Sequence, residues 1–231
     1  MVDVKKKKSY SSSIVLIGNF SPVMFQPYWF RHCDILSENE FNAIDDNKEK
    51  TIITDQLTFF ETENLTFKIE RRRFALVAKK EPFELMVDTF TRLQEKLDSI
   101  LIEKFGLNYS FHVDLETPEN YKTFGDAIAP KTYWESLLSD AIESDSKPSG
   151  LVSMTMKKQT DFGSINVKVE SSVIYNNSIF FDYNFHYEGD PKEPFDIFEV
   201  NEIIENRYSD FARYADKVSR DIIDKVFENG K

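Results

Sequence analysis

The same succession of strand-like and helical sequence patterns occurs twice in this chain. This repetition constrains the fold more than any other feature. The string Lys-Glu-Pro-Phe occurs at residues 80–83 and again at residues 192–195. Each copy stands where strand-like alternation gives way to a long helical pattern, and proline suits the first turn of a helix because its missing N–H would be unpaired there anyway. A short segment with strand-like alternation and a similar sequence precedes each copy, at residues 67–70 and 167–170. The chain therefore carries strands followed by a helix twice over.

This repetition predicts a single α+β domain over residues 13–231, built from two similar halves at 13–142 and 151–231. Residues 143–150 are rich in Ser, Asp, Lys, Pro and Gly and are expected to link the halves. Residues 1–12 include four consecutive lysines and are predicted to form a flexible basic tail.

Apolar alternation with a period of two predicts strands. Those expected before the linker are Ile14–Phe20, Thr51–Phe60, Leu65–Glu70, Phe74–Lys79 and Tyr109–Leu115. Those expected after it are Leu151–Lys158, Ile165–Val173 and Ile179–Tyr187. Helical spacing predicts long helices over 81–105 and from Phe195 almost to the end. We therefore expect a mainly antiparallel, curved sheet with two long amphipathic helices on one face, a helix-grip-like arrangement.

Composition and charge restrict the class of partner. Hydrophobic residues make up 41% of the chain and aromatic residues 14%, which favours a packed globular protein. The formal net charge of −11 argues against nucleic acid as a partner, because phosphates would be repelled. The only internal basic cluster, Arg71–Arg73, is interpreted as a solvated strand edge or a bulge. No apolar run reaches the ~18 residues of a membrane span, and no signal segment is recognisable, so a cytoplasmic protein is expected.

Few residues combine into a pattern that suggests catalysis. His112, Asp114 and Glu116 are expected on one strand face, where they would ligate a divalent cation or exchange protons, or would simply be the solvent side of a half-exposed strand. The simpler interpretation is favoured, so neither a metal nor another cofactor is predicted. Asp161-Phe162-Gly163 spells a kinase metal-binding triplet, but without the other kinase motifs it predicts a hairpin turn.

The aromatic segment near the N-terminus is the main candidate for an interaction site. Prolines at positions 22 and 27 prevent this segment from continuing a strand or helix, so its rings need either a core pocket or a partner. Aromatic residues and arginine are enriched at the centres of protein interfaces. The candidate residues are Phe25, Tyr28, Trp29, Phe30 and Arg31.

Several segments together resemble a family of bacterial proteins that has no established activity. These segments are Ile-Val-Leu-Ile-Gly-Asn-Phe at 14–20, Phe-Gln-Pro-Tyr-Trp-Phe at 25–30, Phe-Gly-Asp-Ala-Ile-Ala-Pro-Lys-Thr-Tyr-Trp at 124–134 and Val-Lys-Val-Glu at 167–170. The resemblance spans nearly the whole chain. It implies a bacterial, cytoplasmic protein and assigns no catalytic residue.

The favoured function is a non-enzymatic protein-binding module, acting as a subunit or accessory of a multi-gene bacterial system. Its partner is expected to be another protein or a second copy of the chain. A small-ligand-binding, helix-grip-like protein is the first alternative, because a curved sheet that grips a helix often leaves a pocket between them. An enzyme that uses His112 and its carboxylate neighbours, and an acidic inhibitor that mimics the ligand of a DNA-binding protein, also stay open.

Overall fold

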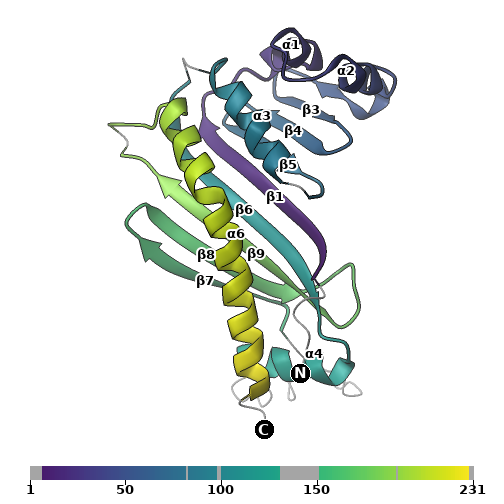
Figure 1. Cartoon of the computed structure of the whole chain (residues 1–231), viewed down its shortest axis with the longest axis vertical. Helices are drawn as coiled ribbons and strands as arrows, with labels where there is room; N and C mark the ends of the chain where they lie inside the picture. Colours follow the sequence, from purple (N-terminus) through teal and green to yellow (C-terminus); the bar gives the residue numbers. More distant parts are fainter. Residues whose placement is uncertain (1–6, 82, 98–99, 131–150, 191, 229–231) are drawn as a thin grey trace, which may run out of the picture.

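A computed structural model describes residues 7–81, 83–97, 100–130, 151–190 and 192–228. Its strands form one open antiparallel sheet of nine strands in the order β2-β3-β4-β5-β1-β6-β9-β8-β7. Figure 1 shows the helices gathered over one face of this sheet, with the long helix α6 lying across it. The predicted α+β class with a mainly antiparallel sheet is confirmed.

The strands are β1 (Lys7–Gly18), β2 (Ile52–Ile53), β3 (Leu57–Glu61), β4 (Leu65–Glu70), β5 (Arg73–Ala78), β6 (Ile102–Asp114), β7 (Ser153–Thr160), β8 (Gly163–Ser171) and β9 (Ser178–Glu188). The α-helices are α1 (Pro27–His32), α2 (Glu38–Asp45), α3 (Glu84–Gln94), α4 (Pro118–Ile128) and α6 (Ile197–Glu228). Two short 3₁₀ helices, η1 (Pro22–Met24) and η2 (Lys48–Lys50), flank α1 and α2.

The core lies between the sheet and the helices. Alternate side chains of a strand point to opposite faces, so one face of each central strand supplies the core. On β6 and β9 these residues are largely aromatic and lie in register across the strand pair, as Phe105 opposite Tyr187 and Phe111 opposite Phe181 illustrate. The rings of Phe105 and Tyr187 stack with centroids 4.4 Å apart.

Helix α6 is attached to the sheet by buried hydroxyl pairs as well as by apolar contacts. The Tyr183 and Ser219 hydroxyls lie 2.6 Å apart, and the Tyr208 hydroxyl donates to the Ser12 hydroxyl oxygen at 2.8 Å. Such bonds orient the helix because a buried hydroxyl without a partner is costly. The predicted C-terminal helix is confirmed, and its length of 32 residues lets it span several strands.

The opposite face of the sheet is polar at its centre. Side-chain amides form a ladder across β8, β9, β6 and β1, in which Asn166 donates to Asn184 at 3.0 Å, Asn184 to Asn108 at 2.7 Å, and Asn108 to Ser13 at 2.9 Å. These mutual bonds satisfy half-buried amides on a face that the described helices leave uncovered.

The predicted helix over 81–105 is wrong in its extent. Helix α3 ends at Gln94 and has 11 residues, and β6 begins at Ile102. The alternation of Phe105, Leu107 and later core residues already starts within the range predicted to be helical. Pairing with the long strands β1 and β9 favours the extended conformation here, and this information is not local in the sequence.

Two further boundaries differ from expectation. Strand β1 begins at Lys7, so residues 7–12, assigned to a flexible tail, belong to the sheet. The side chain of Lys7 is only 10% exposed and is ion-paired with Asp216 of α6. The expected strand Thr51–Phe60 is divided into β2 and β3 by a tight turn. The linker at 143–150 and the preceding residues from 131 lie outside the described residues.

Side chains cap the starts of two helices, and the hairpin turn predicted at Asp161-Phe162-Gly163 is confirmed. Ser37 and Glu40 form the capping box at the start of α2, and the Thr117 side chain caps α4 by accepting from the Asn120 N–H at 3.1 Å. Asp161 and Phe162 form the turn between β7 and β8. Within the described ranges, none of the helices has both the length and the apolar character needed to cross a membrane.

Candidate functional site

The aromatic segment at residues 25–31 is divided between the core and the surface. Phe25 and Phe30 are 3% and 0% exposed, and the Phe30 ring contacts Phe67 at a centroid distance of 4.8 Å. Trp29 is half-buried and packs edge-on against Phe25 at 5.1 Å. Because these rings fill the space between α1 and the sheet, the expectation that they form a binding surface is wrong for Phe25 and Phe30.

Tyr28 is the aromatic residue of this segment that faces solvent. It is 69% exposed, and three large apolar side chains of the neighbouring elements η1 and β2 are exposed by at least 43%. We call Val23, Met24, Tyr28 and Ile53 the α1–β2 surface, whereas Ile52, which is 45% exposed, lies on the opposite face of β2. A hollow of about 430 Å³ opens beside Tyr28 and Ile53, with Pro27, Phe41 and Ile44 among its other lining residues. This end of the molecule is therefore apolar, exposed and concave.

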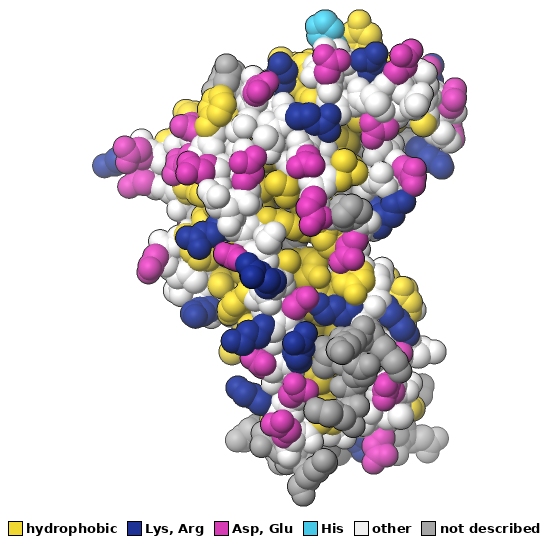
Figure 2. All heavy atoms as spheres, in the orientation of Figure 1, with side chains coloured by type: hydrophobic (Ala, Val, Ile, Leu, Met, Phe, Trp, Pro, Cys, Tyr) yellow, Lys and Arg dark blue, Asp and Glu magenta, His cyan; other side chains and the backbone are white. Residues whose placement is uncertain are grey.

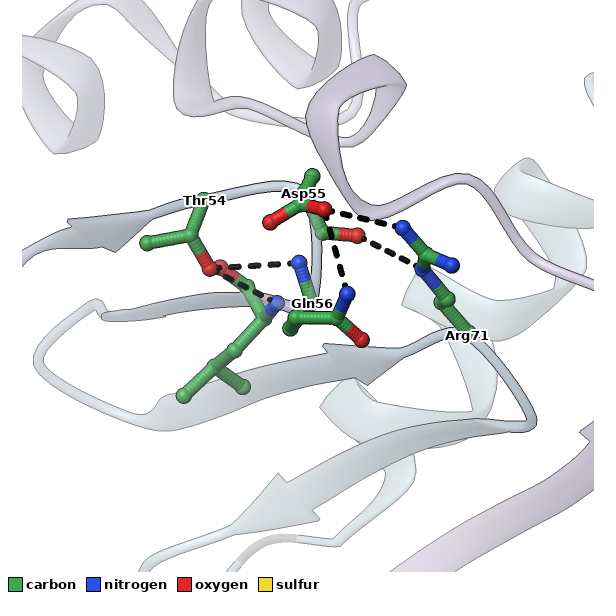
Figure 3. Close-up of polar contacts among 5 residues, drawn as sticks. Thr54, Asp55, Gln56 and Arg71 are labelled. Carbon is green, nitrogen blue, oxygen red and sulfur yellow. Dashed lines mark hydrogen bonds and ion pairs between the residues drawn. The ribbon is translucent and has the colours of Figure 1, made fainter.

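The second feature of this surface is the unpaired edge of strand β2. Among the described strands, β2 pairs only with β3, so its other side carries backbone groups to which none of these strands binds. Figure 3 shows how the turn after β2 is fixed: Arg71 donates to the Asp55 backbone carbonyl at 3.1 Å and pairs with the Asp55 carboxylate at 2.9 Å. The Thr54 hydroxyl accepts from the Leu57 N–H at 3.0 Å within the same turn.

The arginines of the region are held by acidic neighbours. Arg31 lies 3.5 Å from Asp34 and 3.9 Å from Glu38. Arg72, in the turn between β4 and β5, contacts both carboxylate oxygens of Glu103 at 2.6 Å, and Arg73 lies 3.8 Å from Glu70. The triplet Arg71–Arg73 therefore joins neighbouring strands and turns to one another.

His112, which was expected on a polar, solvent-facing side of its strand, is buried instead. His112 is only 6% exposed and lies under the rings of Phe180 and Tyr175, at centroid distances of 4.8 and 5.2 Å. Its Nδ1 has no hydrogen-bond partner among the described residues. Burial lowers the pKa of His112, and the nearby Glu170 carboxylate opposes this effect.

Asp114 and Glu116 do not complete a shared face with His112. Asp114 ends β6, where its carboxylate accepts from Lys8 at 2.7 Å and from the Glu116 N–H at 2.8 Å. Glu116 follows the strand with a φ of 70°, so the strand alternation does not reach it. In the part of the chain that the structure describes, no three His, Cys, Asp or Glu side chains are grouped to hold a metal ion.

A second hollow lies between α3 and α6. It has a volume of about 410 Å³ and is lined by Glu81, Phe83, Glu84, Tyr109, Tyr208, Ser209, Ala212, Arg213 and Asp216. Figure 2 shows hydrophobic side chains near the middle of the helix-covered face, next to acidic ones. Burial raises the pKa of Tyr109, and the carboxylates of Asp216 and Glu81 raise it further.

Sequence reasoning missed most residues of both regions for an identifiable reason. Ile52 and Ile53 belong to a run that alternates like a buried strand, and nothing local shows that β2 is at the edge. Glu81 and Tyr109 are far apart in sequence, and only the packing of α3 on the sheet brings them to one hollow. Comparisons with known proteins add nothing to these sites, since neither a protein-family model nor a curated protein matches the chain.

Proposed function

We propose that this protein is a non-enzymatic binding module that recognises a protein partner through the α1–β2 surface. The observation that carries the proposal is the exposure of four large apolar side chains, between 43% and 69%, at one end of the sheet. Exposed apolar side chains that lie close together often mark an interaction site, because their burial on binding is favourable.

The chemistry of this surface suits a partner that adds a strand or inserts an apolar side chain. The free side of β2 offers backbone donors and acceptors, and the hollow beside Tyr28 offers an apolar pocket. Tyrosine is a frequent interface anchor because it buries a large area at little cost in side-chain entropy. Either a different protein or a second copy of the chain fits these requirements.

The setting of this function is a proposal based on the resemblance to bacterial proteins without an established activity. We propose that the chain acts in the bacterial cytoplasm, as a subunit or accessory of a multi-gene system. The net charge of −11 supports, as a further candidate, an acidic inhibitor that binds a basic, DNA-binding protein.

We further propose that the scaffold is a pseudo-duplication, and the strand order supports this. The meander β3-β4-β5 ends beside β1 and is followed by α3, while the meander β7-β8-β9 ends beside β6 and is followed by α6. Phe83 and Phe195, the last residues of the two Lys-Glu-Pro-Phe strings, contact Tyr109 and Phe105 of β6. On this basis the halves meet between α3 and β6, earlier than residues 143–150.

Purification of the tagged chain from its native host tests the binding function. We expect one protein to be recovered in stoichiometric amount, and we expect the double variant Tyr28→Ala, Ile53→Ser to lose it, because both side chains border the apolar hollow. The matched control is Met156→Ser on the opposite edge strand β7, where the side chain is 61% exposed. Retention of the partner by the double variant and its loss from the Met156 variant would place the binding surface elsewhere.

A further inference from the structure

Two central strands of the sheet carry apolar side chains on both of their faces. Residues 14–17 of β1 read Ile-Val-Leu-Ile, and residues 74–78 of β5 read Phe-Ala-Leu-Val-Ala. An antiparallel strand with one face in solvent usually alternates apolar and polar residues, whereas a continuous apolar run is typical of a strand that is covered on both faces. The described helices cover one face of this sheet. The composition of β1 and β5 therefore indicates that the opposite face, which we call the rear face, is a contact surface as well.

The apolar side chains of the rear face lie close together. The strand register places Val15 of β1 opposite Ala75 of β5, and Phe59 of β3 lies in the same row. We call five residues the rear patch; they are Val15, Ile17, Phe59, Ala75 and Val77. Ala75 is 2% exposed and the other four are half-buried. Burial of such a patch against a second surface is favourable.

The amide ladder of Asn166, Asn184 and Asn108 continues the rear face beside this patch. Each carboxamide carries two N–H groups and an acceptor oxygen, and the ladder bonds use one N–H of each amide. In a twofold dimer the same surface meets itself, so it must be complementary to itself. Groups that both donate and accept hydrogen bonds meet this requirement.

The charges of the rear face largely cancel within the face. Three of its lysines each pair with a glutamate; the pairs are Lys68 with Glu70, Lys104 with Glu188, and Lys168 with Glu170. Arg73 and Asp182 add one charge of each sign. The whole chain has a net charge of −11, so two copies repel each other unless they meet through a surface without excess charge. A strongly charged partner would gain little from this face, whereas a second copy fits it.

The rear face is also large enough for a stable dimer. Nine strands about 4.8 Å apart span roughly 40 Å, and the central strands extend for at least about 20 Å along the face. The face therefore offers on the order of 800 Å² per copy, which is the area that each partner buries in a stable protein interface of standard size.

We propose that two copies of the chain form a dimer through the rear faces of their sheets. The twofold axis runs across the strands, along the row that holds Val77, Ser13 and the three ladder amides. Rear patch then meets rear patch, amide ladder meets amide ladder, and the two sheets pack face to face about 10 Å apart. The α1–β2 surface takes no part in this contact.

Sedimentation equilibrium of the full chain tests the existence of the dimer. We expect the chain to sediment with twice its own mass at a concentration of about 100 µM. A chain that stays monomeric up to about 100 µM would overturn the proposal.

Two substitutions on the rear face test the position of the contact. Val77→Lys places a cation in the rear patch, and Asn184→Asp places a carboxylate in the amide ladder. Because both positions lie on the row of the axis, each new charge meets its own counterpart, and we expect each variant to raise the dissociation constant of the dimer by at least about tenfold. The matched controls, Asn206→Lys and Asn206→Asp, introduce the same charges at an exposed position of α6 and should leave this constant unchanged. Circular dichroism shows whether each variant is folded.

Other modes of self-association give different results. Retention of the dimer by both rear-face variants would refute a contact through this face. Loss of the dimer in the double variant Tyr28→Ala, Ile53→Ser would place the contact at the α1–β2 surface and would also overturn the proposal. The two rear-face variants should still bind the protein partner of the α1–β2 surface, so the dimer and the proposed function can fail independently.

Discussion

At the scale of single residues, burial decides what each candidate side chain does. His112 looked like an exposed strand residue, but the rings of Tyr175 and Phe180 cover it. Phe25 and Phe30 looked like interface anchors, but they are core residues, whereas Tyr28 between them is exposed. Sequence spacing assigns faces correctly within a regular element, but it does not show which face another segment covers.

His112 makes stability depend on pH in a definite direction. Its pKa in the folded protein is lowered below the ordinary value of 6.5 by burial. At a pH between the folded and the unfolded pKa of His112, the unfolded chain binds more protons than the folded one. The stability that the neutral, buried His112 contributes is therefore complete above about pH 6.5 and decreases as the pH falls below that value. Urea unfolding between about pH 7.5 and 5.5 should show a smaller loss of stability for His112→Gln than for the parent. Identical pH dependence in the two proteins would contradict this assignment.

At the scale of elements, the turn between β7 and β8 depends on a single glycine. Gly163 has a φ of 142°, and a Cβ at this position would lie 2.3 Å from the His186 carbonyl oxygen. Gly163→Ala should therefore destabilise the protein by about 2–3 kcal/mol, measured as a shift of the urea midpoint.

Gly125 is the matched control for this prediction. It lies within α4, and an added Cβ would meet Leu151 at an ordinary distance of 3.7 Å. Gly125→Ala should leave stability unchanged or raise it by about 0.5–1 kcal/mol, because alanine favours the helix. Equal effects of the two substitutions would mean that backbone conformation at Gly163 is not the determining factor.

Element boundaries show where local sequence information ends. The capping signals at Ser37 and Thr117 predict the starts of α2 and α4 because they act within one helical turn. The end of α3 was mispredicted because the residues after it satisfy both a helical and a strand period. The long strand β6 is selected by its neighbours β1 and β9, which are remote in sequence.

At the scale of the whole molecule, the sequence predicted the layer architecture but not the sites. Alternating and helical patterns suffice for a sheet with helices on one face. The α1–β2 surface depends on β2 being at the edge of the nine-stranded sheet, and the hollow depends on α3 packing beside α6. Both are consequences of strand order and helix placement, which residue patterns do not encode.

The proposed function is also tested at the scale of the whole molecule. A binding module needs one surface that becomes protected when its partner is present, and we assign that surface to the α1–β2 end. Hydrogen–deuterium exchange of the chain alone and with its co-purified partner measures this directly. We predict slower exchange in the complex over residues 22–29 and at β2, with the rest of the sheet unchanged. Protection confined to β7 or α6, with unchanged exchange at β2, would contradict the account.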